Sequence, residues 1–210
     1  MIPEKNQGSV LENQTFSSLN IKSYLNDYVT NLQQVLAQVD TNQFEKVLKT
    51  LAEVTASAKK IYVCGNGGSA AIADHLCCDW SKGTHFKNLP SLKTQSLTAN
   101  TALLTACAND FGFDKSFSQQ LELFAEKGDV LVAISSSGNS ENILQAVYKA
   151  KEKSMTCIGL TGFSGGQLKS ACDLSLHIPF ANYGLVEDAH QILMHVLAQF
   201  FTLQRSEKSL

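Results

Sequence analysis

Three short apolar runs constrain the fold of this chain more than any other feature. They cover residues 61–65, 128–135 and 155–162. A run that stays apolar at consecutive positions, instead of alternate ones, is typical of a parallel strand that is buried on both faces. Residues 173–179 alternate more, as an outer strand would, and 92–97 form a weaker fifth candidate.

Stretches with helical spacing lie between these runs and before the first of them. We predict helices over 16–39, 44–58, 69–82, 100–109, 114–126, 140–153, 166–171 and 185–204. Because strand and helix alternate, the fold class is α/β, with an open parallel five-stranded sheet, flavodoxin-like and flanked by helices, and an N-terminal helical extension. We expect one domain over residues 17–207 after a flexible N-terminus, 1–16.

Charge and hydropathy exclude several classes of function. The chain has a formal net charge of -2, and nucleic-acid binding usually needs a basic face. No apolar stretch approaches the roughly 20 residues needed to span a bilayer. The first 20 residues are polar and lack the apolar centre of a signal peptide, so we expect a cytoplasmic protein. The six cysteines are expected to be core residues.

Two glycine- and serine-rich loops follow predicted strands. They read GNGGS (65–69) and SSSGNS (135–140). Ligands of such sheets bind beyond the carboxyl ends of the strands, and small residues let backbone N–H groups approach a phosphate at a helix N-terminus. Each loop alone is more simply a turn with a helix cap. Two of them at equivalent strand ends favour a phosphate site.

These loops, together with ANDFGF (108–113) and LTGFSGG (160–166), resemble the SIS (sugar isomerase) domain family. The resemblance is greatest to phosphoheptose isomerases and extends over about residues 20–203. It implies that the phosphate is held by Ser135, Ser136, Ser137 and Ser140. It also implies that the sugar site is lined by Asn66, Gly67, Gly68, Ser69, Asn109 and Asp110.

Two segments carry candidate acid–base or metal-binding groups. His75 and Asp79 are four residues apart on a predicted helix and share one face. In the last predicted helix, His190 and His195 project about 140° apart, so only one of them is expected to serve the site. A lone histidine on an apolar helix is more often a core residue. The family resemblance implies His75, Asp79, Glu187 and His195 as the constellation, with Asp79 as general base and His195 as general acid or partner base.

This chain departs from the family pattern at the site. Asp79 stands where glutamate is usual and Glu187 where glutamine is usual, and no arginine precedes Glu187. The four residues still provide oxygen and imidazole ligands, a set that suits Zn²⁺ or a similar divalent ion. Lys82 is either a solvated lysine or a contact for substrate or a neighbouring subunit.

The resemblance implies an aldose–ketose isomerase of a sugar phosphate, most simply sedoheptulose 7-phosphate, that supplies heptose for a surface polysaccharide. The alternative is a non-catalytic SIS protein that binds a replication initiator or another protein; such relatives lack the carboxylate at 79. We predict no nucleic-acid or membrane partner. The long apolar stripe of the N-terminal helix predicts a homo-oligomer, which the resemblance makes a tetramer with sites between subunits.

Overall fold

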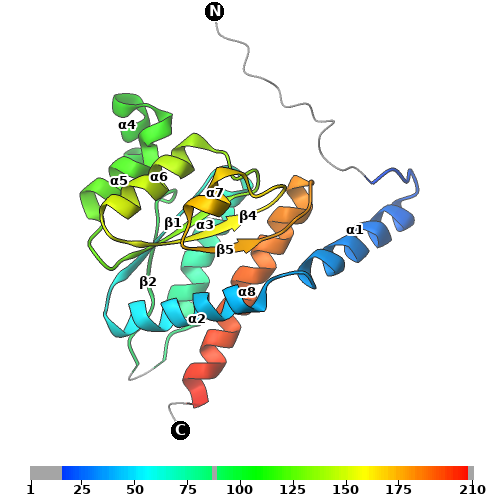
Figure 1. Ribbon diagram of the computed structural model, residues 1–210, viewed down its shortest axis with the longest axis horizontal. Helices are drawn as coiled ribbons and strands as arrows, with labels where there is room; N and C mark the ends of the chain where they lie inside the picture. Colours follow the sequence, from blue (N-terminus) through cyan, green and yellow to red (C-terminus); the bar gives the residue numbers. More distant parts are fainter. Residues whose placement is uncertain (1–15, 87–88, 208–210) are drawn as a thin grey trace, which may run out of the picture.

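Five parallel strands form the central layer of the protein (Figure 1). The computed structural model describes residues 16–86 and 89–207. The strands run in the order β2-β1-β3-β4-β5 and have the bounds β1 (Lys60–Gly65), β2 (Lys93–Ser96), β3 (Val130–Ser135), β4 (Thr156–Thr161) and β5 (Leu174–His177). The predicted fold class is confirmed, with every strand within two residues of its expected bounds.

Helices cover both faces of this sheet. One face packs against α2 (Thr41–Ala56), α3 (Gly68–Cys78) and α8 (Tyr183–Glu207). The other packs against α5 (Ser116–Phe124), α6 (Glu141–Glu152) and α7 (Gly166–Ala171), with α4 (Thr101–Phe111) on the outside against α5. A short 3₁₀ turn, η3 (Phe113–Lys115), joins α4 to α5. None of the described helices is long and apolar enough to cross a membrane.

The side chains of each central strand divide between two cores. Ile61 and Val63 of β1 point into the core under α3 and α8, whereas Tyr62 and Cys64 point into the core under α5 and α6. Successive strand residues face opposite sides of a sheet, so a strand that is covered on both sides must be apolar throughout. This is why β1, β3 and β4 gave the continuous apolar runs, and why β2 and β5, the two edge strands, gave weaker patterns.

The first described helix is shorter than its apolar spacing predicted. α1 spans Ile21–Leu36 because Asn20 caps it: the Asn20 side chain accepts hydrogen bonds from the backbone N–H groups of Lys22 and Ser23. Phe16, before the cap, packs edge-on against Tyr24 with ring centroids 5.3 Å apart. Of the predicted flexible N-terminus, residues 1–15 lie outside the described residues.

α1 is attached to the body mainly at its C-terminal half. Tyr28 donates a hydrogen bond of 2.6 Å to the Asp188 carboxylate on α8, and Val35 is the helix's only buried residue. Figure 1 shows the N-terminal half of α1 extending away from the sheet. Large apolar side chains remain exposed on α1 and just before it: Leu19, Ile21, Leu25 and Val29.

Candidate functional site

The serine loop after β3 is folded by its own polar groups. The backbone N–H of Gly138 donates to both the carbonyl and the hydroxyl oxygen of Ser135, at 3.1 and 3.2 Å. Gly138 has a φ of 68°, a conformation that favours glycine. The hydroxyl groups of Ser135 and Ser140 lie 3.3 Å apart. The loop therefore draws its serine hydroxyls together beside the start of α6.

Among the described residues, two of these serines make no hydrogen bond from their hydroxyl groups to the backbone. Ser140 is the N-cap residue of α6, yet its side chain makes no capping hydrogen bond. Ser136 is buried, and its hydroxyl oxygen has no hydrogen-bond partner among the described residues. A buried polar group without a partner costs about 1–3 kcal/mol, so its retention points to a ligand.

The second small-residue loop, Asn66–Ser69, lies against the first. The side-chain amides of Asn66 and Asn142 on α6 exchange two hydrogen bonds, of 2.8 and 2.9 Å. Gly67 precedes α3 with a φ of 56°. The next residue, Gly68, begins α3 and leaves room for a carboxylate, because a Cβ there would lie 2.2 Å from Glu187 Oε2.

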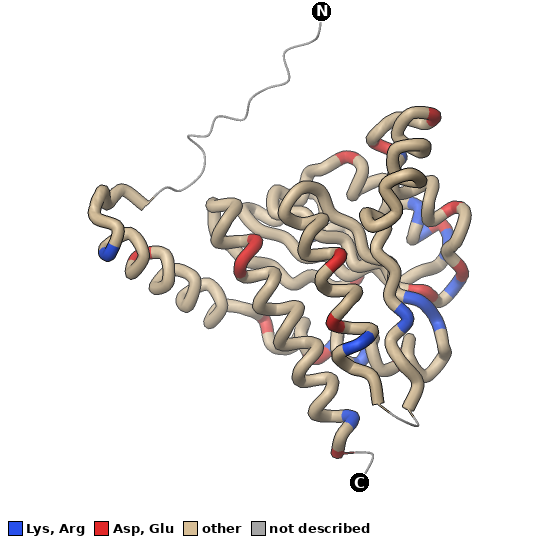
Figure 2. Tube along the Cα trace, turned by 180° about the vertical axis from the view of Figure 1, so that it is seen from behind, with Lys and Arg blue, Asp and Glu red and all other residues tan. Residues whose placement is uncertain are grey.

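Both loops and the start of α8 enclose one small cavity of about 160 Å³. Five serines of the two predicted loops line it together with Asn66, and α8 contributes Tyr183 and Glu187. No lysine or arginine lines it. Figure 2 shows acidic segments on α3 and α8 where these helices run side by side. Hydroxyl groups, backbone N–H groups and helix N-termini are therefore the donors that this part of the chain offers an anion.

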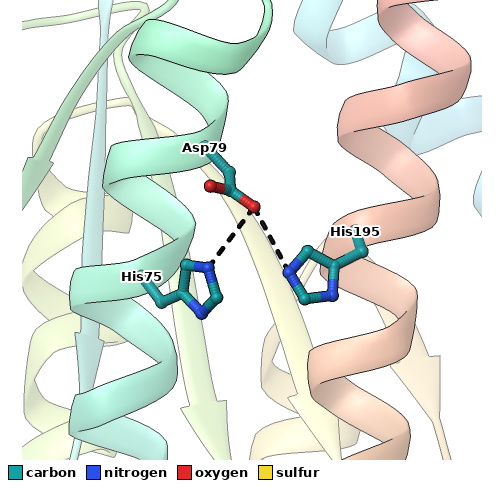
Figure 3. Close-up of side chains that lie close together, drawn as sticks. All are labelled: His75, Asp79 and His195. Carbon is teal, nitrogen blue, oxygen red and sulfur yellow. Dashed lines mark ion pairs between the residues drawn. The ribbon is translucent and has the colours of Figure 1, made fainter.

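Two histidines and one aspartate converge farther along the same two helices (Figure 3). Asp79 Oδ2 lies 3.5 Å from His75 Nε2 and 3.3 Å from His195 Nε2. The two imidazole rings are 5.0 Å apart and nearly perpendicular. We call these three residues the His–Asp–His cluster. The pairing of His75 and Asp79 on one helix face follows the prediction from their spacing.

The backbone changes its winding at this cluster. The predicted helix 69–82 is divided into α3 and a π-helical turn, η2 (Asp79–Gly83). Trp80, which is fully buried, anchors the turn by donating an indole hydrogen bond of 3.3 Å to the Met194 carbonyl oxygen on α8. π-turns of this kind often occur at functional sites. Here the turn begins at the carboxylate of the cluster.

α3 and α8 both begin at the serine cavity, and each carries its cluster residues at about the same distance along the helix from that cavity. Gly68 and Glu187 are in contact at the cavity, and His75 and His195 are in contact seven and eight residues later. At 1.5 Å of rise per residue, about 10–12 Å separates the two levels. A ligand with an anionic group at one end can reach both.

In the structure, Glu187 does not lie with His75, Asp79 and His195, the residues with which the sequence analysis grouped it. Glu187 lines the serine cavity, and the metal-ligating atoms that cluster in the described residues belong to His75, Asp79 and His195 alone. Glu187 and His195 are eight residues apart on α8, so an axial rise of about 12 Å separates them. Asn109 and Asp110 are also apart from the cavity: they are exposed on α4 and bond to each other at 2.9 Å.

The sequence analysis did not predict Gln191, a polar residue beside the His–Asp–His cluster. Gln191 on α8 places its amide nitrogen 2.8 Å from His75 Nδ1 and 3.4 Å from His195 Nε2. The available signal was its position four residues before His195, one turn away on the same helix face.

His190 is a core residue, as expected for one of the two histidines of α8. It is fully buried, and Nε2 donates to the Thr161 carbonyl oxygen at 3.2 Å. Burial, the largest cause, lowers the pKa of His190 to about 4. The unfolded chain therefore binds this proton at a higher pH than the folded chain, so the associated stability is present above about pH 6.5 and is lost as the pH falls towards 4.

We expect His190→Gln to lose less free energy of unfolding than the wild type as the pH falls from about 7 to 4.5. Urea unfolding of the wild-type protein should show a loss of about 2 kcal/mol from His190 between pH 7 and pH 4.5, and the variant should lack that part. The variant itself should be less stable at pH 7, because it loses packing at a buried position. His85→Gln, at an exposed position, is the control. Equal acid-side losses in wild type and His190→Gln would contradict the assignment.

The Glu187 carboxylate lies in the cavity that offers donors to an anion. Desolvation first, and the neighbouring Asp188 charge second, raise the pKa of Glu187. We expect Glu187→Gln to bind a sugar phosphate about fivefold more tightly at pH 8, because it removes a like charge worth on the order of 1 kcal/mol. Calorimetric titration at low salt measures this. Weaker binding by the variant would show that the carboxylate holds the ligand directly.

The His–Asp–His cluster has the donor set of a divalent-metal site. Its two imidazole nitrogens and one carboxylate oxygen all lie within 4.8 Å of one another. Nitrogen and oxygen ligands of this kind bind Zn²⁺, and three protein ligands leave a position open for substrate. The residues present therefore fit a catalytic metal ion.

Comparisons with known proteins agree on one family. A family model described as "SIS domain" matches residues 23–162. Phosphoheptose isomerase from Burkholderia pseudomallei is 37% identical over 83% of this chain and 91% of its own. Solved phosphoheptose isomerases from Neisseria gonorrhoeae (31% identity, TM-score 0.79) and Francisella tularensis (30%, TM-score 0.80) cover 86% and 87% of this chain, and 96% of each of their own chains.

Proposed function

This chain belongs to the SIS domain family, and within that family we propose that it is an aldose–ketose isomerase that converts sedoheptulose 7-phosphate to D-glycero-D-manno-heptose 7-phosphate. The observation that carries the proposal is the arrangement of α3 and α8. Both helices start at a serine cavity suited to a phosphate group, and both lead to one His–Asp–His cluster. A sugar phosphate can thus be held at one end and react at the other.

The serine cavity supplies the phosphate site. The donors are the unpartnered hydroxyl group of Ser136, the hydroxyl group of Ser140, which makes no capping bond, and the N-terminal N–H groups of α6. A helix N-terminus also carries a partial positive charge, which favours an anion. Binding energy from the phosphate orients the sugar chain towards the cluster, and such positioning raises the rate of the reaction at the far end.

Isomerisation moves a proton between C1 and C2 of the sugar through an enediol intermediate. Asp79 is the base that takes the proton from C1 and returns it to C2, since it is the only carboxylate in the cluster. His195, 3.3 Å from Asp79, transfers the proton between the two sugar oxygens. The side chain of Asp79 is 31% exposed, so the proton that it carries can exchange with solvent.

A divalent ion, in our proposal Zn²⁺, would be held by one ligand atom each of His75, Asp79 and His195, which leaves the second carboxylate oxygen of Asp79 and the second ring nitrogen of His195 for proton transfer. When bound, it would polarise the sugar oxygens and stabilise the negative charge that develops on them. Without the ion, the same three side chains still bring two imidazoles and a carboxylate to the reacting carbons.

A homotetramer in the cytoplasm is the proposed working form. The exposed apolar side chains of α1 support an interface with another copy of the chain. An assembly with sites between subunits would also account for Asn109 and Asp110, which are exposed on α4. These two residues would then complete the sugar site of a neighbouring subunit.

The proposal is tested by incubating the protein with sedoheptulose 7-phosphate and following the aldose product by chromatography. Turnover is expected with the phosphorylated sugar, should be far slower with free sedoheptulose, and should fall on addition of a chelator. Binding of phosphate esters without turnover of any ketose phosphate would overturn the enzyme and favour a non-catalytic SIS protein.

A further inference from the structure

Among residues 16–86 and 89–207, Gln191 is the uncharged polar side chain that contacts both histidines of the cluster. It lies on α8 one turn before His195, and its amide nitrogen is 2.8 Å from His75 Nδ1. The other ring nitrogen of His75, Nε2, faces Asp79 Oδ2 at 3.5 Å. The amide therefore contacts the side of the His75 ring that Asp79 leaves unoccupied.

The orientation of this amide decides which nitrogen of His75 carries the proton. A neutral imidazole has one N–H donor and one acceptor. When the NH₂ group of Gln191 faces His75, Nδ1 accepts and Nε2 carries the proton, which then points to Asp79. When the amide is turned over, its oxygen accepts from Nδ1–H, and the lone pair of Nε2 points to Asp79 and the cluster. Only the second state leaves His75 able to bind a cation through Nε2.

We propose that Gln191 is a positioning residue that turns its amide between these two states and so selects the metal-binding tautomer of His75. A histidine that ligates a metal ion usually donates its other N–H to an oxygen, and that partner fixes both the tautomer and the ring orientation. The amide of Gln191 is suited to this because it offers a donor to the metal-free tautomer and an acceptor to the metal-bound one. The inference rests on the metal site of the proposed function.

Replacement of Gln191 separates its hydrogen-bonding role from its bulk. Gln191→Met keeps an unbranched chain of similar length and removes both amide groups, and Gln191→Glu keeps an acceptor only. We expect the affinity for Zn²⁺, titrated against a competing chelator, to fall about tenfold in Gln191→Met. It should be retained or raised in Gln191→Glu. Gln204→Met, at an exposed position on the same helix, should not change it.

A spectroscopic measurement reads the tautomer directly. In ¹⁵N-labelled protein loaded with Zn²⁺, the His75 ring should show a protonated Nδ1 in the wild type and in Gln191→Glu. In Gln191→Met this N–H should exchange faster with water, because the His75 side chain is 49% exposed and loses its partner. An unchanged exchange rate, or a Zn²⁺ affinity of Gln191→Met within twofold of the wild type, would overturn the proposal.

These measurements use no substrate, so they are independent of the isomerase assay. Suppose that the wild type turns over the sugar and that Gln191→Met keeps the wild-type Zn²⁺ affinity and His75 N–H exchange rate. This result would reject the role of Gln191 and leave the proposed function standing. Failure of turnover combined with the expected loss of Zn²⁺ affinity would reject the function and retain the positioning role.

Discussion

Asp79→Asn is expected to lower kcat for the isomerisation of sedoheptulose 7-phosphate by about 10³-fold, within the range found for positioned acids and bases. Asparagine has nearly the shape of aspartate but cannot accept the C1 proton. It should leave KM almost unchanged, because the phosphate is held at the serine cavity, about 10–12 Å away along α3 and α8. Steady-state kinetics of the wild type and Asp79→Asn at saturating Zn²⁺ measure the effect.

A neighbouring carboxylate provides the matched control. Asp74 lies on the same helix, is exposed, and accepts a hydrogen bond of 2.6 Å from the Thr98 hydroxyl group. Asp74→Asn should retain kcat within a factor of about two, since it removes the same charge without touching the cluster. If Asp79→Asn kept more than a tenth of the wild-type kcat, Asp79 would not be the base.

The aspartate itself is a departure from the family pattern, and Asp79→Glu tests what it costs. The π-helical turn that begins at Asp79 already brings Oδ2 to both imidazoles. A longer side chain at this position has to fold back to keep the same contacts. We therefore expect Asp79→Glu to be active but slower than the wild type, because a misplacement of about 1 Å can cost up to 100-fold in rate.

Gly138→Ala should have the second large effect, this time on folding and phosphate binding together. A Cβ at Gly138 would lie 2.0 Å from the backbone oxygen of Gly165, and the φ of 68° would be strained for alanine. Because the obstructing atoms are backbone, no side chain can move aside. The Leu168 N–H donates a hydrogen bond of 2.9 Å to the Gly138 carbonyl oxygen, so a shift of the loop would disturb this bond as well.

We expect Gly138→Ala to lower the free energy of unfolding by about 3 kcal/mol, the sum of left-handed strain and overpacking. Urea denaturation measures this, and calorimetry should show at least a tenfold weaker affinity for the sugar phosphate. Gly83→Ala is the control, since a Cβ at Gly83 meets nothing within 4 Å. Wild-type stability of Gly138→Ala would mean that the serine loop does not pack as described.

The sequence predicted the sheet well because burial on both faces leaves a strong local pattern. The continuous apolar runs gave β1, β3 and β4, and the weaker runs gave the two edge strands. The start of α1 was predicted too early, since the spacing of its apolar residues continues before Asn20, whose side chain ends the pattern as a cap. The π-helical turn after α3 leaves no such pattern and depends on packing against α8.

The site was predicted where neighbours in sequence are neighbours in space. His75 and Asp79 share a helix face, and the serines of residues 135–140 share a loop, so local spacing was enough. The contact between Glu187 and Gly68, and that between Gln191 and His75, join different helices. They depend on how α3 and α8 align over the sheet, which no local pattern records. Family resemblance placed Glu187 with the metal ligands, whereas in the structure it lines the serine cavity.

The central claim is that the cluster moves a proton from C1 to C2 of a phosphorylated ketose. Its most direct test is NMR of the product formed from sedoheptulose 7-phosphate in D₂O. Since Asp79 is 31% exposed, the base should exchange its proton with solvent, and the aldose 7-phosphate should carry deuterium at C2. Product without deuterium at C2 would contradict a base that exchanges its proton with solvent, and no aldose product from folded, Zn²⁺-loaded protein would contradict the central claim itself.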